Sequence, residues 1–224
     1  MHKWVMDLSL VGAKIGVFYI PFLFALCFHE FAHGLVAKWR GDRTAEMMGR
    51  LTLNPAAHVD WLGTVMLPIM AIVFSSPIFF GWAKPVPVNE RNLKSPRKDM
   101  FWVALAGPLS NVILAIIGAL LLGFSFRFFQ FSPYLSAIKN LLDVFIRTNL
   151  FLAVFNILPL HPLDGGKVLA RFLPAAINYK LEQNQQISSM VLMMLVLTGA
   201  LQILAYPVYS LTTLLETVGL RIFL

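Results

Sequence analysis

Residues 17–33 read VFYIPFLFALCFHEFAH, so three ionisable side chains stand at the end of a long apolar run. A helix needs about 20 mostly apolar residues to cross a bilayer, and the stretch from residue 8 to residue 37 meets that length. Ionisable groups inside such a helix are costly and usually mark a functional site. His29, Glu30 and His33 are therefore the first candidates for a chemical role.

The composition predicts a polytopic membrane protein. Of the 224 residues, 58% are hydrophobic and 13% are charged, whereas soluble domains carry about 25% charged residues. The net charge of +7 is explained by basic loops that flank membrane spans, so nucleic acid is not expected as a partner. The single Cys27 excludes an internal disulfide and a thiolate-rich metal site.

Five apolar stretches are long enough to be spans: 8–37, 62–82, 101–124, 141–160 and 187–206. We therefore expect an all-α fold with a core of three transmembrane helices and further flanking helices. No linker or repeat divides the chain, so residues 1–224 are predicted to form one domain. Its core is expected at about 10–170 and its C-terminal helices at 187–224.

The stretch 62–82 is expected not to span. Basic segments at 38–50 and 84–98 flank it on both sides, and a full crossing would place one of them outside the cell. Pro68 and Pro77 supply points at which the helix can bend. A re-entrant or shallow segment fits this pattern better.

The spacing of the HEFAH motif (29–33) is typical of a zinc site. Residues i and i+4 share one face of a helix, so His29 and His33 can bind the same ion. Glu30 would then act as the general base on the water that zinc activates. The alternative is a polar helix end with two interfacial histidines.

A catalytic zinc site needs a third protein ligand. The best candidate is Asp164 in FNILPLHPLDGGKVL (155–169), beside two glycines that allow close approach. From the residues alone, a helix-capping or turn aspartate explains the Asp-Gly pair equally well. Both interpretations stay open at this point.

Five stretches together resemble the site-2 protease family of intramembrane zinc metalloproteases. They are HEFAH (29–33), NILPLHPLDGG (156–166), LTLNPAAHVDWLGT (51–64), GWAKPVPVN (81–89) and AGPLSN (106–111). The likeness covers about residues 10–170 and is to a compact bacterial subgroup without a PDZ-like or CBS-like domain.

This resemblance implies that His29, His33 and Asp164 hold one zinc ion per chain and that Glu30 activates water. The implied reaction is hydrolysis of peptide bonds within transmembrane segments of membrane-anchored substrates. The implied partners are the lipid bilayer and a helical membrane-protein substrate.

Other polar residues near these motifs have two readings each. Asn156 either contacts substrate or a developing oxyanion, or is a buried packing amide. Asn111 either packs helices together or orients a metal ligand. His58 and His161 each either hydrogen-bond to a metal ligand, bind the metal as an additional ligand, or are interfacial histidines without a role at the metal. The segment 81–89 either pairs with an unwound substrate by strand addition or is a rigid loop.

The basic loop at 38–50 is expected to be cytosolic. The resemblance implies a metal centre within the membrane, nearer the cytosol, so we predict a multi-pass protein of the bacterial inner membrane with its active site on that side. The rival hypothesis is a non-catalytic zinc-binding membrane protein, such as a transporter or scaffold. A transporter would carry polar residues in several spans. In the predicted spans of this chain, nearly the only ionisable residues outside the motifs are Lys14, Asp143 and Arg147.

Overall fold

The computed structural model describes residues 8–74 and 81–224. All regular secondary structure in this described part is helical, which confirms the all-α prediction. The α-helices are α1 (Leu8–Lys14), α2 (Ile20–Arg40), α3 (Thr44–Met47), α4 (Leu67–Val73), α5 (Pro96–Phe128), α6 (Leu135–Asn156), α7 (Asp164–Ala170), α8 (Ala175–Gln183), α9 (Gln185–Leu197) and α10 (Ala205–Phe223). Short π- or 3₁₀-helical turns are Ile15–Tyr19, Pro55–Ala57, Trp61–Met66, Glu90–Asn92 and Ala200–Leu204.

Helix α2 carries the HEFAH motif and continues from α1 through a π-helical turn. The continuous helix Val11–Arg40 is 30 residues long and apolar enough to cross a membrane. It ends at Gly41, whose φ of 114° is a left-handed conformation that glycine adopts without a steric penalty. The chain therefore turns back immediately after the helix and returns along its surface.

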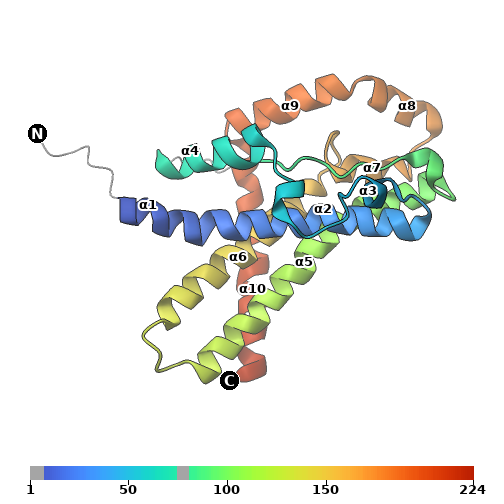
Figure 1. The fold of residues 1–224 in the computed structure, drawn as a ribbon. Helices are drawn as coiled ribbons and strands as arrows, with labels where there is room; N and C mark the ends of the chain where they lie inside the picture. Colours follow the sequence, from blue (N-terminus) through green and yellow to red (C-terminus); the bar gives the residue numbers. More distant parts are fainter. Residues whose placement is uncertain (1–7, 75–80) are drawn as a thin grey trace, which may run out of the picture.

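Helices α5 and α6 form the centre of the molecule, joined by a short loop so that they run antiparallel (Figure 1). A cluster of buried apolar side chains fills the space where α5, α6 and α10 meet: Ala115, Ala119, Leu122, Ile146, Leu150 and Val208. A second cluster packs α6 against α2 through Leu152 and Phe22. Helix α2 is thus held against the pair at the level of its histidines.

The C-terminal part corrects one sequence prediction. We expected a span at 187–206, but Gln185–Leu197 forms only the short helix α9, and the long apolar helix is Ala200–Phe223. The chain turns at Gly199, which has a φ of 73°. Pro207 does not end the helix because it lies in the first turn of α10, where backbone N–H groups lack intrahelical partners.

The stretch predicted not to span begins with Trp61–Val73, a short apolar helical segment. Its length falls below the about 20 residues needed to cross a bilayer, which agrees with a shallow or re-entrant segment. Pro77 and the rest of 75–80 lie outside the described residues. Three helices in the described part are long and apolar enough to span: Val11–Arg40, Pro96–Phe128 and Ala200–Phe223.

Two loops that pack on the C-terminal half of α2 are joined by Asp42, which is 1% exposed. Its carboxylate accepts hydrogen bonds from the backbone N–H of Thr44 at 3.0 Å, from that of Asn89 at 2.8 Å and from the Asn92 side chain at 2.9 Å. Burial alone would raise the pKa of Asp42, but these hydrogen bonds outweigh it and lower the pKa. Asp42 thereby anchors the segment that returns along α2.

Candidate metal centre

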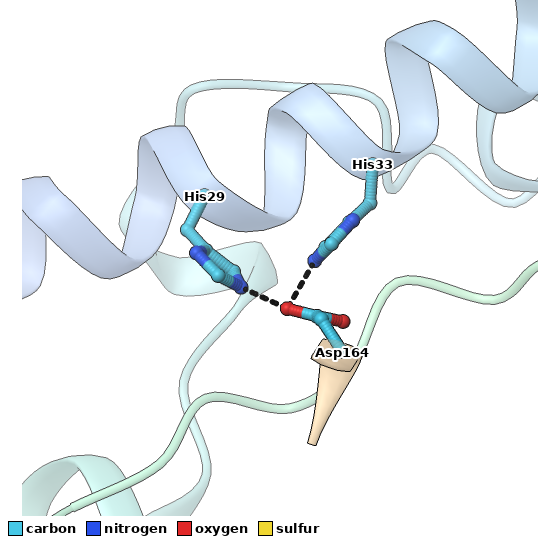
Figure 2. Close-up of side chains that lie close together, drawn as sticks. All are labelled: His29, His33 and Asp164. Carbon is cyan, nitrogen blue, oxygen red and sulfur yellow. Dashed lines mark hydrogen bonds and ion pairs between the residues drawn. The ribbon is translucent and has the colours of Figure 1, made fainter. Parts of the chain in front are cut away.

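Three ligand side chains from distant parts of the sequence meet at one point. Figure 2 shows His29 and His33 on one face of α2, both directed at Asp164, which is the first residue of α7. One oxygen of Asp164 lies 3.0 Å from Nε2 of His29 and 3.3 Å from Nε2 of His33. Among the described residues, this is the group of His, Cys, Asp and Glu side chains that can share a metal ion.

The geometry fits zinc. Zinc binds histidine nitrogen at about 2.0–2.1 Å and carboxylate oxygen at about 2.0–2.2 Å, so tetrahedral ligand atoms lie about 3.3 Å apart. The two separations from Asp164 match this value, and the candidate ligand atoms all lie within 4.8 Å of one another. Two imidazoles and one carboxylate form a typical donor set for a catalytic zinc ion that keeps one position for water.

Hydrogen bonds behind the two imidazoles turn Nε2 toward the centre. Nδ1 of His29 lies 2.7 Å from Oδ1 of Asn111, and Nδ1 of His33 lies 2.7 Å from the carbonyl oxygen of Val103. The carbonyl oxygen can only accept, so Nδ1 of His33 is the donor and its Nε2 carries the free lone pair. Such partners orient the ring and select the tautomer that binds metal.

The AGPLSN motif in α5 explains how this helix approaches the histidines. A Cβ on Gly107 would lie 2.6 Å from Cε1 of His29 and would also collide with the ring of His33. Four residues later, Asn111 forms a hydrogen bond with the ring of His29. A glycine and an asparagine one turn apart therefore provide room for the imidazoles and a partner for one of them.

Asp164 reaches the centre because α7 packs beside α5 and tightly against the turn that follows α6. Any side chain on Gly165 would collide with the carbonyl oxygens of Ile157 and Leu158. At the other end of α7, the Arg97 guanidinium donates to the carbonyl oxygens of Ala170 and Leu173. These contacts fix both ends of the segment that presents the carboxylate.

Glu30 lies next to the centre and is not one of its ligands. Its Oε2 accepts a hydrogen bond of 2.7 Å from the backbone N–H of Val86. The Arg50 guanidinium donates to the carbonyl oxygens of Lys84 and Pro85 at 2.8 and 3.2 Å, which holds the same segment from its other side. These contacts hold segment 81–89 as a loop that packs along α2.

The remaining candidates lie apart from the three ligand atoms. His58 is 3% exposed, and its Nε2 donates to the carbonyl oxygen of Thr52 at 2.8 Å. His161 lies in the turn before α7, against Gly166. The Asn156 side chain donates to Leu152 of its own helix at 3.0 Å. Neither histidine joins the metal-binding group found among the described residues.

Sequence reasoning missed two contributors. The Val86 N–H beside Glu30 belongs to the backbone and has no residue signature. Asn149 accepts a hydrogen bond from Asn111, the residue that contacts His29. It was not among the predicted site residues, although it is an amide within the apolar stretch 141–160. Its spacing of seven from Asn156 places both amides on one face of α6, which was the available signal.

Comparison with known proteins identifies the family. The model of peptidase family M50 matches residues 17–145 and 130–199. The chain is 35% identical over 193 residues to "Putative zinc metalloprotease YwhC" of Bacillus subtilis, covering 85% of this chain and 84% of the relative. It is 32% identical over 200 residues to "Putative zinc metalloprotease Rip2" of Mycolicibacterium smegmatis, covering 88% and 72%.

No solved structure matches the chain at a significant level. The family match extends over more than half of the sequence and includes the HEFAH motif and Asp164. It confirms the resemblance drawn from the five stretches. The chain therefore belongs to peptidase family M50, the site-2 proteases, and is an integral membrane zinc metalloprotease.

Proposed function

We propose that this protein hydrolyses peptide bonds within transmembrane segments of membrane-anchored substrates. The observation that carries this proposal is that Asp164 meets His29 and His33 of a membrane-length helix, beside Glu30, a carboxylate of the same helix that is not among the candidate ligands. All four groups needed for metal-assisted hydrolysis are present. A non-catalytic scaffold would have no use for Glu30 in this position.

His29, His33 and Asp164 would hold one zinc ion per chain. That ion would supply Lewis-acid chemistry, polarising the scissile carbonyl and lowering the pKa of water to about 7. Glu30 takes the proton from the attacking water and passes it to the leaving amine. Its contact with Val86 keeps one oxygen fixed, and its other oxygen remains for this proton transfer.

Substrate reaches the centre from the bilayer, since His29 and His33 lie on a membrane-length helix. A helical substrate must unwind locally, because its peptide bonds are otherwise shielded within the helix. The reaction consumes water, and we infer that water enters from the cytosolic side, next to the basic loop after Arg40. The expected setting is the bacterial inner membrane.

The test combines metal analysis with product analysis. Purified wild type and Glu30→Gln should each contain about one zinc per chain, and Asp164→Ala should lose most of it. Reconstituted with single-span peptides, the wild type should release fragments cut inside the apolar segment, as measured by mass spectrometry. Glu30→Gln should release none.

The outcome that contradicts the proposal is specific. If the wild type binds zinc fully yet cuts no more peptide than Glu30→Gln, the protein is a zinc-binding transporter or scaffold. Zinc uptake by sealed vesicles would then distinguish transport from scaffolding. Full zinc retention in Asp164→Ala would instead move the third ligand elsewhere, with His58 and His161 the next residues to test.

A further inference from the structure

Two fully buried side-chain amides connect α6 to the metal ligand His29. Asn111 on α5 and Asn149 on α6 are each 0% exposed. Nδ2 of Asn111 lies 2.9 Å from Oδ1 of Asn149 and 3.1 Å from the carbonyl oxygen of Ala25. Nδ2 of Asn149 lies 2.9 Å from the carbonyl oxygen of Phe145. Every polar atom in this chain of amides therefore has a partner.

The rules of donors and acceptors give the chain a single direction. The Phe145 carbonyl only accepts, so Asn149 must direct its NH₂ there and its oxygen at Asn111. Asn111 must then donate to both Asn149 and Ala25, which leaves its own oxygen for His29. An amide oxygen accepts only, so His29 must donate from Nδ1 and present the lone pair of Nε2 to the metal.

His33 reaches the same tautomer by a different route. Its Nδ1 donates to the backbone carbonyl of Val103, which no side-chain substitution removes. The orientation of His29 depends instead on the side chain of Asn111, which is held by Asn149 on α6 and by the Ala25 carbonyl on α2. The two imidazoles therefore differ in what holds them. A side-chain substitution that disturbs the tautomer of His29 should leave that of His33 unchanged, so His33 serves as an internal reference.

We propose that Asn149 is a positioning residue for His29, acting through Asn111 to fix the imidazole tautomer that binds zinc. The inference rests on the metal centre of the proposed function. It assigns α6 a part in the centre although α6 contributes no ligand. Displacement of α6 relative to α5 would release the oxygen of Asn149 from Asn111 and with it the constraint on His29.

Asn149→Leu tests this, because leucine has the same branched arrangement of side-chain heavy atoms and offers no acceptor to Asn111. Loss of a direct partner of a ligand typically weakens metal binding about 10- to 100-fold, so loss of Asn149, one hydrogen bond further away, should weaken it up to about 10-fold. We expect that loss in a competitive zinc titration, together with an altered d–d spectrum of the cobalt-loaded protein. Asn149→Asp retains the acceptor oxygen and should restore most of the affinity.

Thr212→Val is the matched control. Thr212 is 1% exposed, and its hydroxyl donates only within α10, to Val208 at 2.8 Å. The substitution removes a buried polar group of a neighbouring helix without touching the amide chain. It should leave zinc affinity and the cobalt spectrum as in the wild type.

A second measurement needs no variant. In zinc-loaded wild type labelled with nitrogen-15 histidine, His29 should show a protonated Nδ1 and a coordinated Nε2. Coordination through Nδ1, or wild-type affinity and spectrum in Asn149→Leu, would overturn the inference alone. A wild type that binds no zinc would overturn both this inference and the proposed function.

Discussion

The backbone N–H of Val86 donates a hydrogen bond of 2.7 Å to Oε2 of Glu30. Pro85 and Pro87 flank Val86, so it supplies the one backbone N–H of this three-residue run, and the residue before a proline favours an extended backbone. The carboxylate proposed as general base is thereby held by a group that cannot rotate away. This contact makes the segment 81–89 part of the proposed catalytic arrangement.

We expect Val86→Pro to slow peptide hydrolysis about 10- to 100-fold, because it removes the donor to Glu30. Hydrogen bonds to charged groups contribute about 1.5–3 kcal/mol, and about 1.4 kcal/mol corresponds to a tenfold change in rate. The measurement is the initial rate on a reconstituted transmembrane peptide. Zinc content should stay at the wild-type level, since no ligand is altered.

Val86→Ala separates the backbone from the side chain in that experiment. Alanine keeps the N–H and trims only the methyl groups that contact Gly34. Its rate should stay within a few-fold of the wild type. Equal slowing in both variants would show that packing of the side chain, and not the hydrogen bond, supports Glu30.

Gly107→Ala should abolish zinc binding although Gly107 is no ligand. The added Cβ would lie 2.6 Å from Cε1 of His29 and would collide with the ring of His33, so both imidazoles must move. Elemental analysis of the purified variant measures the loss. Gly12→Ala is the control, because a Cβ at Gly12 meets no atom within 4 Å. Normal zinc in Gly107→Ala would show that α5 can withdraw from the histidines.

The stability of the protein should fall in acid through Asp42. Hydrogen bonds hold the pKa of Asp42 below its ordinary value in the folded state. The contribution of this carboxylate to the free energy of unfolding is therefore fully present above about pH 4. The contribution is lost as the pH falls through the lower, folded-state pKa. Melting temperatures measured from pH 7 down to pH 3 should show this decline in the wild type.

Asp42→Ala should be less stable by about 2 kcal/mol at pH 7, because buried donors lose their acceptor. It should also show a smaller decline in acid than the wild type. Glu90→Ala removes the same charge from an exposed position and should melt as the wild type does. Parallel pH profiles for the wild type and Asp42→Ala would exclude Asp42 as the source.

A cysteine placed at residue 90 should react with a membrane-impermeant maleimide only from the cytosolic side. Glu90 is exposed, and native Cys27 is buried with its thiol donating to the carbonyl oxygen of Leu53 at 3.2 Å, so background labelling should be low. Intact cells and inverted vesicles give the comparison. Labelling of Glu90→Cys in intact cells would contradict the inferred orientation of the active site.

Local sequence was sufficient to predict the helical membrane fold and to place two of the three candidate metal ligands on one face of a helix. Apolar stretches of membrane length form helices because no water is present to satisfy the backbone. Residues four apart on a helix share a face, so His29 and His33 were paired before any tertiary contact was known. The C-terminal helix was misplaced because apolar length alone does not show where a glycine such as Gly199 turns the chain.

What sequence could not supply are the contacts between segments far apart in the chain. Asp164 lies 135 residues from His29 and meets it only because α7 packs on the turn that follows α6 and beside α5. The Asn149–Asn111 chain and the Val86 N–H depend likewise on how helices and loops pack together. The physical reason is that helix periodicity acts over a few residues, whereas these contacts exist only once separate elements are in place.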